Sequence, residues 1–278
     1  MEEYIDLHVH SNASDGTMTP AEVVKLAKES GLSAIALTDH DTVDGIKEAI
    51  EAGKTYGVQV IPGIEISAEY KSGDLHILGL GIDYEDESFK ARVAVCRDSR
   101  DNRNLKMIKK LNEQGFPVTW DIMMERFGAN SITRAHFAKY LIDEGYVADK
   151  DEAFKKYLNP GCPCYVSREK VSPREAIDMI LKAKGHPVLA HPLLYKMNLE
   201  QIESVIVMLK GFGLQGIEAL YSLNRPEDDA ALLKIAKRHG LYITGGSDFH
   251  GAIKPDISIG TGKGNLHITK DVCPMLFA

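Results

Sequence analysis

The sequence alternates short apolar segments with amphipathic segments that carry helix-capping signals, and this alternation restricts the fold more than any other feature. Residues 5–10 alternate apolar and polar side chains, which is the period of a β-strand. The next segment has a capping box at Thr19 and Glu22, has Pro20 at the first helical position, and ends at Gly31. This strand–helix unit recurs along the chain and indicates a parallel α/β fold; the number of units favours a barrel over an open sheet.

Further elements follow from the same two patterns. Short apolar runs predict strands at residues 33–37, 58–61, 76–80, 187–190, 216–220 and 241–244. Amphipathic runs predict helices at residues 43–56, 173–184 and 226–239. The strand–helix order is therefore present in both halves of the chain.

The middle of the chain departs from this order. Helical patterns follow one another without intervening strands, at residues 89–114, 120–127, 134–144 and 150–157. We therefore expect a small helical domain inserted into the barrel, acting as a lid over the substrate. The expected division is residues 1–87 for the first part of the barrel, 88–166 for the insertion and 167–278 for the second part.

Composition excludes several classes of function. The formal net charge is -7, so the molecule offers no general basic field for duplex DNA. No apolar run is long enough to span a membrane. Four cysteines are too few for a disulfide framework in a chain of 278 residues, which favours a reduced, cytoplasmic protein. The sequence leaves the oligomeric state open.

Histidines gather where the predicted strands lie or end. Six of the ten histidines are in such positions: His8, His10, His40, His76, His191 and His250. The C-terminal ends of parallel barrel strands converge on one rim, so these side chains would share a site with the carboxylates of Asp15, Glu65 and Asp248. Mixed imidazole and carboxylate ligands suit Zn, Mn, Fe or Co. Any one pair could be ordinary core or rim histidines, but the joint pattern favours metal binding.

Together these motifs resemble the PHP (polymerase and histidinol phosphatase) family. The resemblance rests on His8-Val9-His10, Asp15, Thr38-Asp39-His40-Asp41, Pro62-Gly63-Ile64-Glu65, His76-Ile77-Leu78-Gly79, Ala190-His191-Pro192 and Ser247-Asp248-Phe249-His250. With the insertion, Thr133-Arg134-Ala135-His136 and Tyr165-Val166, the chain looks like the bacterial branch that acts on nucleotide monophosphates, 3',5'-bisphosphates and short RNA ends. The resemblance implies a distorted (β/α)7 barrel.

The resemblance also implies a centre of two or three divalent metal ions, Mn, Fe or Zn. The implied ligands are His8, His10, Glu65 and Asp248 for one metal, Asp15, His40 and His250 for a second, and Glu65, His76 and His191 for a third. The branch often has Arg-Pro-His where this chain has Arg134-Ala135-His136, which bears on the substrate rather than on the metals.

Such a centre would lower the pKa of a bound water, and the resulting hydroxide would attack a phosphoryl group. Asp39 is expected to orient the His40 ring, or merely to cap the helix that follows. Arg134 would pair with phosphate through its guanidinium fork. His136 would bind phosphate or protonate the leaving group. The alternative for Arg134 and His136 is a solvated helix face with one buried imidazole.

A stripe of polar side chains follows one face of the long predicted helix. It comprises Arg97, Arg100, Arg103 and Asn104. The stripe could receive a second phosphate or an RNA backbone, or it could simply be a solvated face.

The expected function is a metal-dependent phosphoesterase that hydrolyses phosphomonoesters of nucleotides. Its expected substrates are AMP, 3',5'-bisphosphonucleotides and the 5' ends of short oligoribonucleotides. A histidinol-phosphate phosphatase is the main alternative, since the same metals would serve it. Amidohydrolase or lactonase chemistry and a noncatalytic PHP scaffold are the remaining alternatives, and the full set of nine metal-ligand positions speaks against the scaffold.

Overall fold

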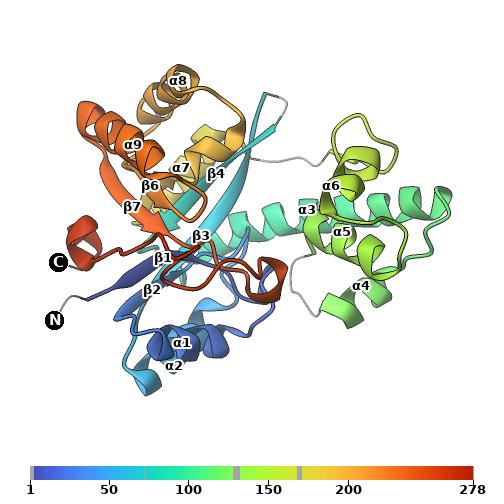
Figure 1. Cartoon of the computed structure of the whole chain (residues 1–278), viewed down its shortest axis with the longest axis horizontal. Helices are drawn as coiled ribbons and strands as arrows, with labels where there is room; N and C mark the ends of the chain where they lie inside the picture. Colours follow the sequence, from blue (N-terminus) through green and yellow to red (C-terminus); the bar gives the residue numbers. More distant parts are fainter. Residues whose placement is uncertain (1–2, 72, 128–131, 168–170, 278) are drawn as a thin grey trace.

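Seven strands form one nearly closed barrel in the computed structural model, which describes residues 3–71, 73–127, 132–167 and 171–277. The strands lie side by side in sequence order. They form the centre of the larger part of the molecule, with helices around them (Figure 1). They are β1 (Ile5–Val9), β2 (Ala34–Leu37), β3 (Gln59–Tyr70), β4 (Gly73–Leu80), β5 (His186–Leu189), β6 (Gly216–Tyr221) and β7 (Tyr242–Gly246). The expected distorted seven-stranded barrel is confirmed.

The sheet closes where the segment after β7 meets β1. The backbone N–H of His10 donates to the carbonyl of Phe249 at 3.0 Å, and the N–H of Asp248 donates to the carbonyl of His8 at 2.8 Å. A Cβ atom on Gly246 would lie 2.3 Å from the Cβ of His8, so only glycine permits this approach. Closure therefore brings the two ends of the chain's strand series together at one rim.

One strand runs against the others, which corrects the expectation of a wholly parallel sheet. β4 is antiparallel to both β3 and β5. A parallel neighbour needs a crossover of about a dozen residues or more, and the short interval between Tyr70 and Gly73 leaves room only for a hairpin. The hairpin pairing continues to Tyr70 and Gly73, which explains why β3 is much longer than the predicted residues 58–61.

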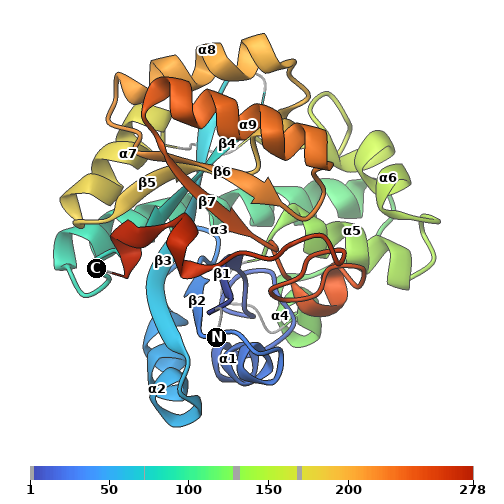
Figure 2. The same cartoon turned by 60° about the vertical axis from the view of Figure 1, so that its left-hand side comes forward.

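Five helices cover the outside of the barrel (Figures 1 and 2). They are α1 (Pro20–Glu29), α2 (Ile46–Tyr56), α7 (Pro173–Lys182), α8 (Leu199–Lys210) and α9 (Pro226–His239). The predicted capping box at the start of α1 is formed, with Glu22 N–H donating to Thr19 Oγ1 at 3.2 Å. Helix α8 was not predicted, although its sequence carries a capping box at Asn198 and Gln201.

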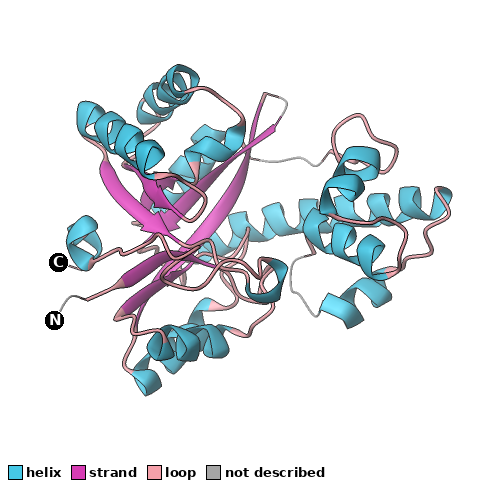
Figure 3. Ribbon diagram, in the orientation of Figure 1, coloured by secondary structure: helices cyan, strands magenta, loops and turns pink. Residues whose placement is uncertain are grey.

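A helical lobe, which falls between β4 and β5 in the sequence, lies to one side of the barrel (Figure 3). It contains α3 (Glu87–Glu113), α4 (Trp120–Phe127), α5 (Arg134–Asp143) and α6 (Lys150–Ala153), which continues as a π-helical turn (Phe154–Leu158). The first half of α3 packs into the barrel core through Phe89 and Val93, whereas its second half packs into a separate core through Met107 and Leu111. One helix thus spans barrel and lobe, and the expected division at 87/88 and 166/167 stays a prediction.

Two expectations from the composition concerned membrane-spanning helices and disulfides. Within the described residues, none of the helices is both long and apolar enough to cross a bilayer. The cysteines Cys96, Cys162, Cys164 and Cys273 are all free thiols.

Candidate metal centre and active site

The strand ends at one rim carry the histidines and carboxylates singled out in the sequence. His8 belongs to β1 and His10 follows it directly, while His40 follows β2 and His191 follows β5. His76 lies near the beginning of β4, and the antiparallel direction of that strand brings it to this same rim. A parallel strand would have put His76 at the opposite end of the barrel.

Glu65 of β3 lies at the centre of the cluster. Its Oε1 atom is 2.7 Å from His76 Nδ1 and 3.0 Å from His191 Nε2. Its Oε2 atom is 3.1 Å from His40 Nδ1 and 3.2 Å from His10 Nε2. A single buried carboxylate thus contacts imidazoles from four different strands or strand ends, as a bridging metal ligand would.

Two aspartates complete the cluster from the other side. Asp15 Oδ1 lies 3.2 Å from His250 Nε2. Asp248 Oδ1 lies 3.4 Å from His10 Nε2 and 3.6 Å from His8 Nε2. Both aspartates are buried, so the rim holds three carboxylates away from bulk water together with Glu65.

Potential ligand atoms fall into three overlapping groups. Within each group the atoms lie within 4.8 Å of one another; the groups are His8, His10 and Glu65; His10, Asp15, His40 and His250; and His40, Glu65 and His76. This grouping differs from the implied one in three ways: Asp248 is absent from the first group, His10 joins the second, and His40 takes the place of His191 in the third. The assignment of individual ligands to individual metals stays a prediction.

The donor chemistry of the cluster fits bound cations. The Nε2 atoms of His8 and His10 face each other at 3.0 Å, an approach that at most one ring proton can bridge. Among the described residues, the buried Nδ1 atoms of His10 and His191 find no hydrogen-bond partner. Buried polar atoms normally have partners, and mixed imidazole and carboxylate sets are typical ligands of Zn, Mn and Fe.

Mutual charge keeps part of the cluster ionised, whereas burial lowers the pKa of His40 to about 3 and also lowers that of His250. Burial alone would favour a neutral acid, but the surrounding imidazoles, led by His40 and His76, keep the pKa of Glu65 well below its usual range. Burial likewise opposes a charge on His10, yet its hydrogen bonds to Asp248 and Glu65 raise the pKa of His10 to about 9. An imidazole binds a metal in its neutral form, so a cation bound by His10 would have to displace the proton that the ring carries.

Glu218 is a residue of this site that the sequence reasoning missed. Its Oε1 atom lies 2.9 Å from His8 Nδ1, and its Oε2 atom accepts the backbone N–H of His191 at 2.8 Å. The residue His191 adopts a φ of 26°, an unfavourable value for a non-glycine residue that its surroundings must hold in place. The available signal was a carboxylate inside the apolar strand β6, because charged side chains are rarely buried without partners.

Asp248 also has partners that the sequence did not indicate. Tyr221 donates its hydroxyl hydrogen to Asp248 Oδ2 at 2.7 Å, and Lys254 Nζ lies 2.5 Å from the same oxygen. Asp248 has a φ of 57°. These contacts leave Oδ1 as the oxygen that faces His8 and His10.

Asp39 has other partners than expected. Its carboxylate accepts hydrogen bonds from the backbone and hydroxyl of Ser11, at 2.8 Å and 2.7 Å, and from the hydroxyl of Ser14 at 2.5 Å. The expected hydrogen bond to the His40 ring was wrong. Asp39 instead orders the loop that carries Asp15.

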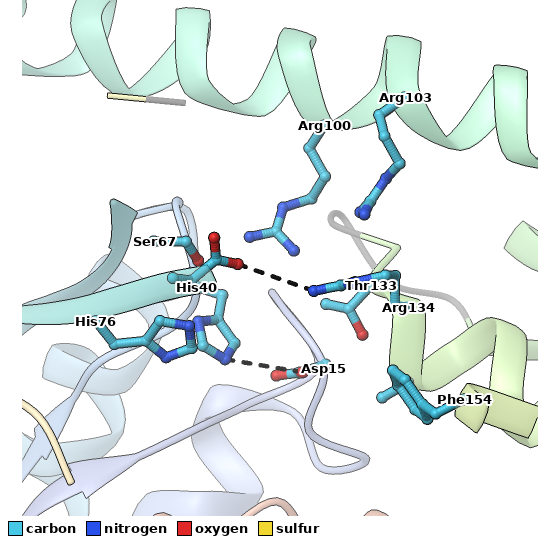
Figure 4. A pocket seen from close by; sticks show the side chains of 11 residues that line it. Asp15, His40, Ser67, His76, Arg100, Arg103, Thr133, Arg134 and Phe154 are labelled. Atoms are coloured by element: carbon cyan, nitrogen blue, oxygen red, sulfur yellow. Dashed lines mark ion pairs between the residues drawn. The ribbon is translucent and has the colours of Figure 1, made fainter. Parts of the chain in front are cut away.

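A polar pocket of about 170 Å³ opens above the cluster (Figure 4). His40, His76 and Asp15 lie on its barrel side, and Arg100, Arg103 and Arg134 point into it from the helical lobe. Arg134 is 3.8 Å from Asp74 Oδ2 and remains partly exposed. The pocket therefore pairs a cluster of metal-ligand type with guanidinium groups, which suits an anionic ligand.

The predicted stripe on α3 divides among several roles. Arg97 forms an ion pair with Asp44 at 2.9 Å, and buried Arg100 forms one with buried Asp41. Asn104 is completely buried, accepts a hydrogen bond from Arg103 Nε at 2.8 Å and donates to a backbone carbonyl at 2.7 Å. Asn104 thus supports the lobe internally, which corrects the expectation that it contacts substrate. Arg100 reaches the pocket but is already paired.

His136 is buried at the start of α5. Its Nδ1 atom accepts the backbone N–H of Thr133 at 3.2 Å, and its ring stacks on Phe127. Burial lowers the pKa of His136 to about 4. At neutral pH the ring is therefore neutral, with its proton on Nε2, so it can donate a hydrogen bond but is a poor proton source. The neutral ring argues against leaving-group protonation, and the residues that line the pocket include its neighbours Thr133, Arg134 and Ala135 rather than His136 itself.

Comparison with known proteins decides the family. The family model described as PHP domain matches residues 6–206, which include seven of the nine clustered positions; Asp248 and His250 lie beyond it. The chain belongs to the PHP domain family. The predicted recognition is confirmed.

Curated relatives of this PHP protein extend over nearly its whole length. It is 37% identical to a 3',5'-nucleoside bisphosphate phosphatase of Chromobacterium violaceum, over 98% of this chain and 93% of the relative. It is 35% identical to a 5'-3' exoribonuclease of Haemophilus influenzae, over 99% and 98%. It is 34% identical to a phosphoribosyl 1,2-cyclic phosphate 1,2-diphosphodiesterase of Eggerthella lenta, over 88% and 94%. The predicted class, a hydrolase of phosphoric ester bonds, is confirmed at this level.

Solved structures agree with the fold. A protein of Bifidobacterium adolescentis, assigned as a metal-dependent phosphoesterase, superposes with a TM-score of 0.85 at 32% identity, over 99% of this chain and 96% of that one. A Chromobacterium violaceum protein described as an amidohydrolase with bound sulfate superposes with a TM-score of 0.83 at 38% identity, over 90% and 88%. Metal-dependent phosphoester chemistry is thus the family-level assignment, whereas the number and identity of the metals are not part of it.

Proposed function

We propose that this PHP protein hydrolyses the phosphomonoesters of nucleotides, namely AMP, 3',5'-bisphosphonucleotides and the 5' ends of short oligoribonucleotides. The observation that carries the proposal is the pocket itself, where Arg134 and Arg103 face the histidine–carboxylate cluster across a narrow polar space. The names of the Chromobacterium and Haemophilus relatives support nucleotide and RNA-end substrates.

Nine residues of the cluster are the proposed metal ligands. They are His8, His10, Asp15, His40, Glu65, His76, His191, Asp248 and His250. When bound there, two or three divalent ions (Mn, Fe or Zn) would lower the pKa of a water molecule and neutralise phosphoryl charge. No protein nucleophile is then required.

The chain's own residues would bind and orient the phosphate ester. Arg134 presents a guanidinium fork to phosphoryl oxygens, and Arg103 adds a second cation at the pocket wall. The neutral His136 ring contributes a hydrogen bond from Nε2. The helical lobe, proposed as residues 88–166, acts as the lid that excludes water and selects the substrate.

The test is phosphate release by Mn-reconstituted protein from AMP, 3'-phosphoadenosine 5'-phosphate, a 5'-phosphorylated dinucleotide and histidinol phosphate, with a chelated control. We expect release from the nucleotides only, lost with chelator and in an Asp248→Asn variant that remains folded. Preference for histidinol phosphate would favour a histidinol-phosphate phosphatase. Absence of phosphate release from all four compounds would favour amidohydrolase chemistry or a noncatalytic scaffold.

A further inference from the structure

A groove continues from the metal pocket along helix α3. Arg103 lines both the metal pocket and a neighbouring cavity of about 760 Å³. Lys106 and Ser167 line that cavity and also the next one, of about 470 Å³. Shared lining residues therefore join the three spaces into one path that follows α3, the helix that runs from the barrel into the lobe (Figure 1).

The α3 wall of this path is basic beyond the metal pocket. Its basic side chains, in order along the helix, are those of Arg103, Lys106, Lys109 and Lys110, with Glu113 at the far end. The middle cavity is lined from α3 by Val95, Asp98, Ser99 and Asn102 as well. These cations stand out because the whole chain has a formal net charge of -7. From Arg103 to Lys110 the helix rises by roughly 10 Å.

The lysines are available to a ligand to different degrees. Lys106 and Lys109 are exposed, and neither forms an ion pair within the part of the chain that the structure describes. Lys110 donates to the backbone carbonyl of Tyr165 at 2.8 Å. The acidic residues Glu69 and Asp98 line only the middle cavity, so the outer part of the path carries the net positive charge.

One aromatic ring lies in the outer cavity and also contacts a residue of the metal pocket. Tyr165 lines the outer cavity, and the guanidinium carbon of Arg134, which lines the metal pocket, lies 5.7 Å from the centre of its ring. A partly buried tyrosine beside a row of cations matches the way proteins hold single-stranded nucleic acid, with cations on the phosphates and aromatic rings on the bases.

We propose that this groove binds the second and following nucleotides of a 5'-phosphorylated single-stranded RNA while its 5' phosphate occupies the metal pocket. The inference rests on the proposed function and adds to it the surface that holds the strand beyond its 5' end. Lys106 and Lys109 would contact backbone phosphates, and Tyr165 would stack on a base. The strand would leave the site along α3.

The test compares a 5'-phosphorylated RNA hexamer with AMP in wild type and in a Lys106→Gln/Lys109→Gln variant. The matched control is Lys234→Gln/Lys237→Gln, a pair with the same spacing on the exposed side of α9. Two phosphate contacts to a single strand change the salt slope by about 1.4, so raising salt from about 50 to 200 mM should cost wild type about sevenfold more kcat/KM on the hexamer than the variant. AMP hydrolysis should be unchanged in both variants.

Binding gives a second readout that does not depend on turnover. Fluorescence anisotropy of a labelled hexamer, measured with chelator present, should show weaker binding by the lysine variant and about tenfold weaker binding by Tyr165→Ala. Equal hexamer binding and equal kcat/KM in wild type, the lysine variant and the α9 control would overturn the proposal that this groove binds RNA. So would a wild-type protein that hydrolyses AMP but neither binds nor cleaves the hexamer, whereas loss of AMP hydrolysis with intact hexamer binding would overturn the proposed function alone.

Discussion

Single residues at the barrel rim serve two distinct purposes. One set faces the pocket, as Glu65 and His76 do. Another set sits behind it and holds the first set in place, as Glu218 does for His8 and for the backbone of His191. Partners of this second kind set the tautomer and orientation of metal-binding imidazoles, and their loss weakens metal affinity.

Glu218→Gln is therefore expected to lower metal affinity roughly 10- to 100-fold while the protein stays folded. The amide retains the size of the carboxylate but cannot supply its charge to His8. Calorimetric titration with Mn²⁺ measures the effect. Glu203→Gln is the matched control, because Glu203 also contacts a histidine, His239, at 2.7 Å but lies away from the cluster. Equal affinities for wild type and Glu218→Gln would refute the role of Glu218 in holding His8 and His191 in place for metal binding.

His136 should leave a signature in the pH dependence of stability. Burial lowers the pKa of His136 in the folded state to about 4, from 6.5 in the unfolded chain. The unfolded state thus takes up a proton first as the pH falls, and the folded state loses stability between about pH 6.5 and 4. At pH 5 this linkage costs about 2 kcal/mol relative to pH 8.

A His136→Gln variant should lack this part of the pH dependence. Urea unfolding at pH 8 and pH 5, with chelator in both, should show a smaller loss of unfolding free energy in the variant. All other histidines contribute equally to both proteins, so the difference isolates His136. The same loss in wild type and variant would contradict its burial as a neutral ring.

At the scale of elements, helix α3 connects the lobe to the barrel through two ion pairs of different burial. Arg100 pairs with Asp41, and these residues are only 5% and 1% exposed. Arg97 pairs with Asp44 on the surface, with side chains 35% and 45% exposed. Both acidic partners follow strand β2, so the two pairs form a natural comparison.

Asp41→Asn should destabilise the protein by about 3–5 kcal/mol, because it leaves the buried Arg100 charge without its partner. Asp44→Asn should cost under about 1 kcal/mol, as is usual for an exposed pair. Asn tolerates the left-handed backbone that Asp41 adopts at a φ of 52°, so the variant isolates the charge. Urea unfolding measures both. An additional Arg100→Met change should recover most of the loss, and failure to recover would mean that Asp41 acts through other contacts.

Elements also show where sequence patterns were sufficient. The capping box and proline predicted the start of α1 correctly, and the β1 alternation placed His8 and His10 on one face. The direction of β4 was not readable, because its apolar run looks the same in either direction and only the short hairpin to β3 decides it. Helix α8 was missed between two clearer elements despite its capping residues.

At the scale of the whole molecule, the cluster joins both halves of the barrel, so cations bound there should stabilise the complete fold. A ligand at about 100 times its dissociation constant adds about 2.7 kcal/mol to the free energy of unfolding. For a chain of this size that corresponds to a rise in Tm of ~5–10 °C. Differential scanning fluorimetry with Mn²⁺ or with chelator measures the shift.

The shift should be much smaller in Asp248→Asn, which alters a proposed ligand without changing its size. Wild type and variant with identical shifts would show that the cations act elsewhere on the molecule. A Tm that does not respond to any of Mn, Fe or Zn would contradict a metal centre in the barrel.

The sequence by itself predicted a barrel from its strand–helix order, the PHP family from the resemblance of its motifs, and nine candidate ligand positions, because histidines and carboxylates at strand ends are recognisable without coordinates. Tertiary structure decided what depends on contacts between distant segments. It placed Glu218 behind His8, turned Asp39 toward Ser11 and Ser14, and engaged Arg100 with Asp41. A sequence pattern reports the periodicity of its own segment, whereas a hydrogen bond across 210 residues exists only once the barrel has closed.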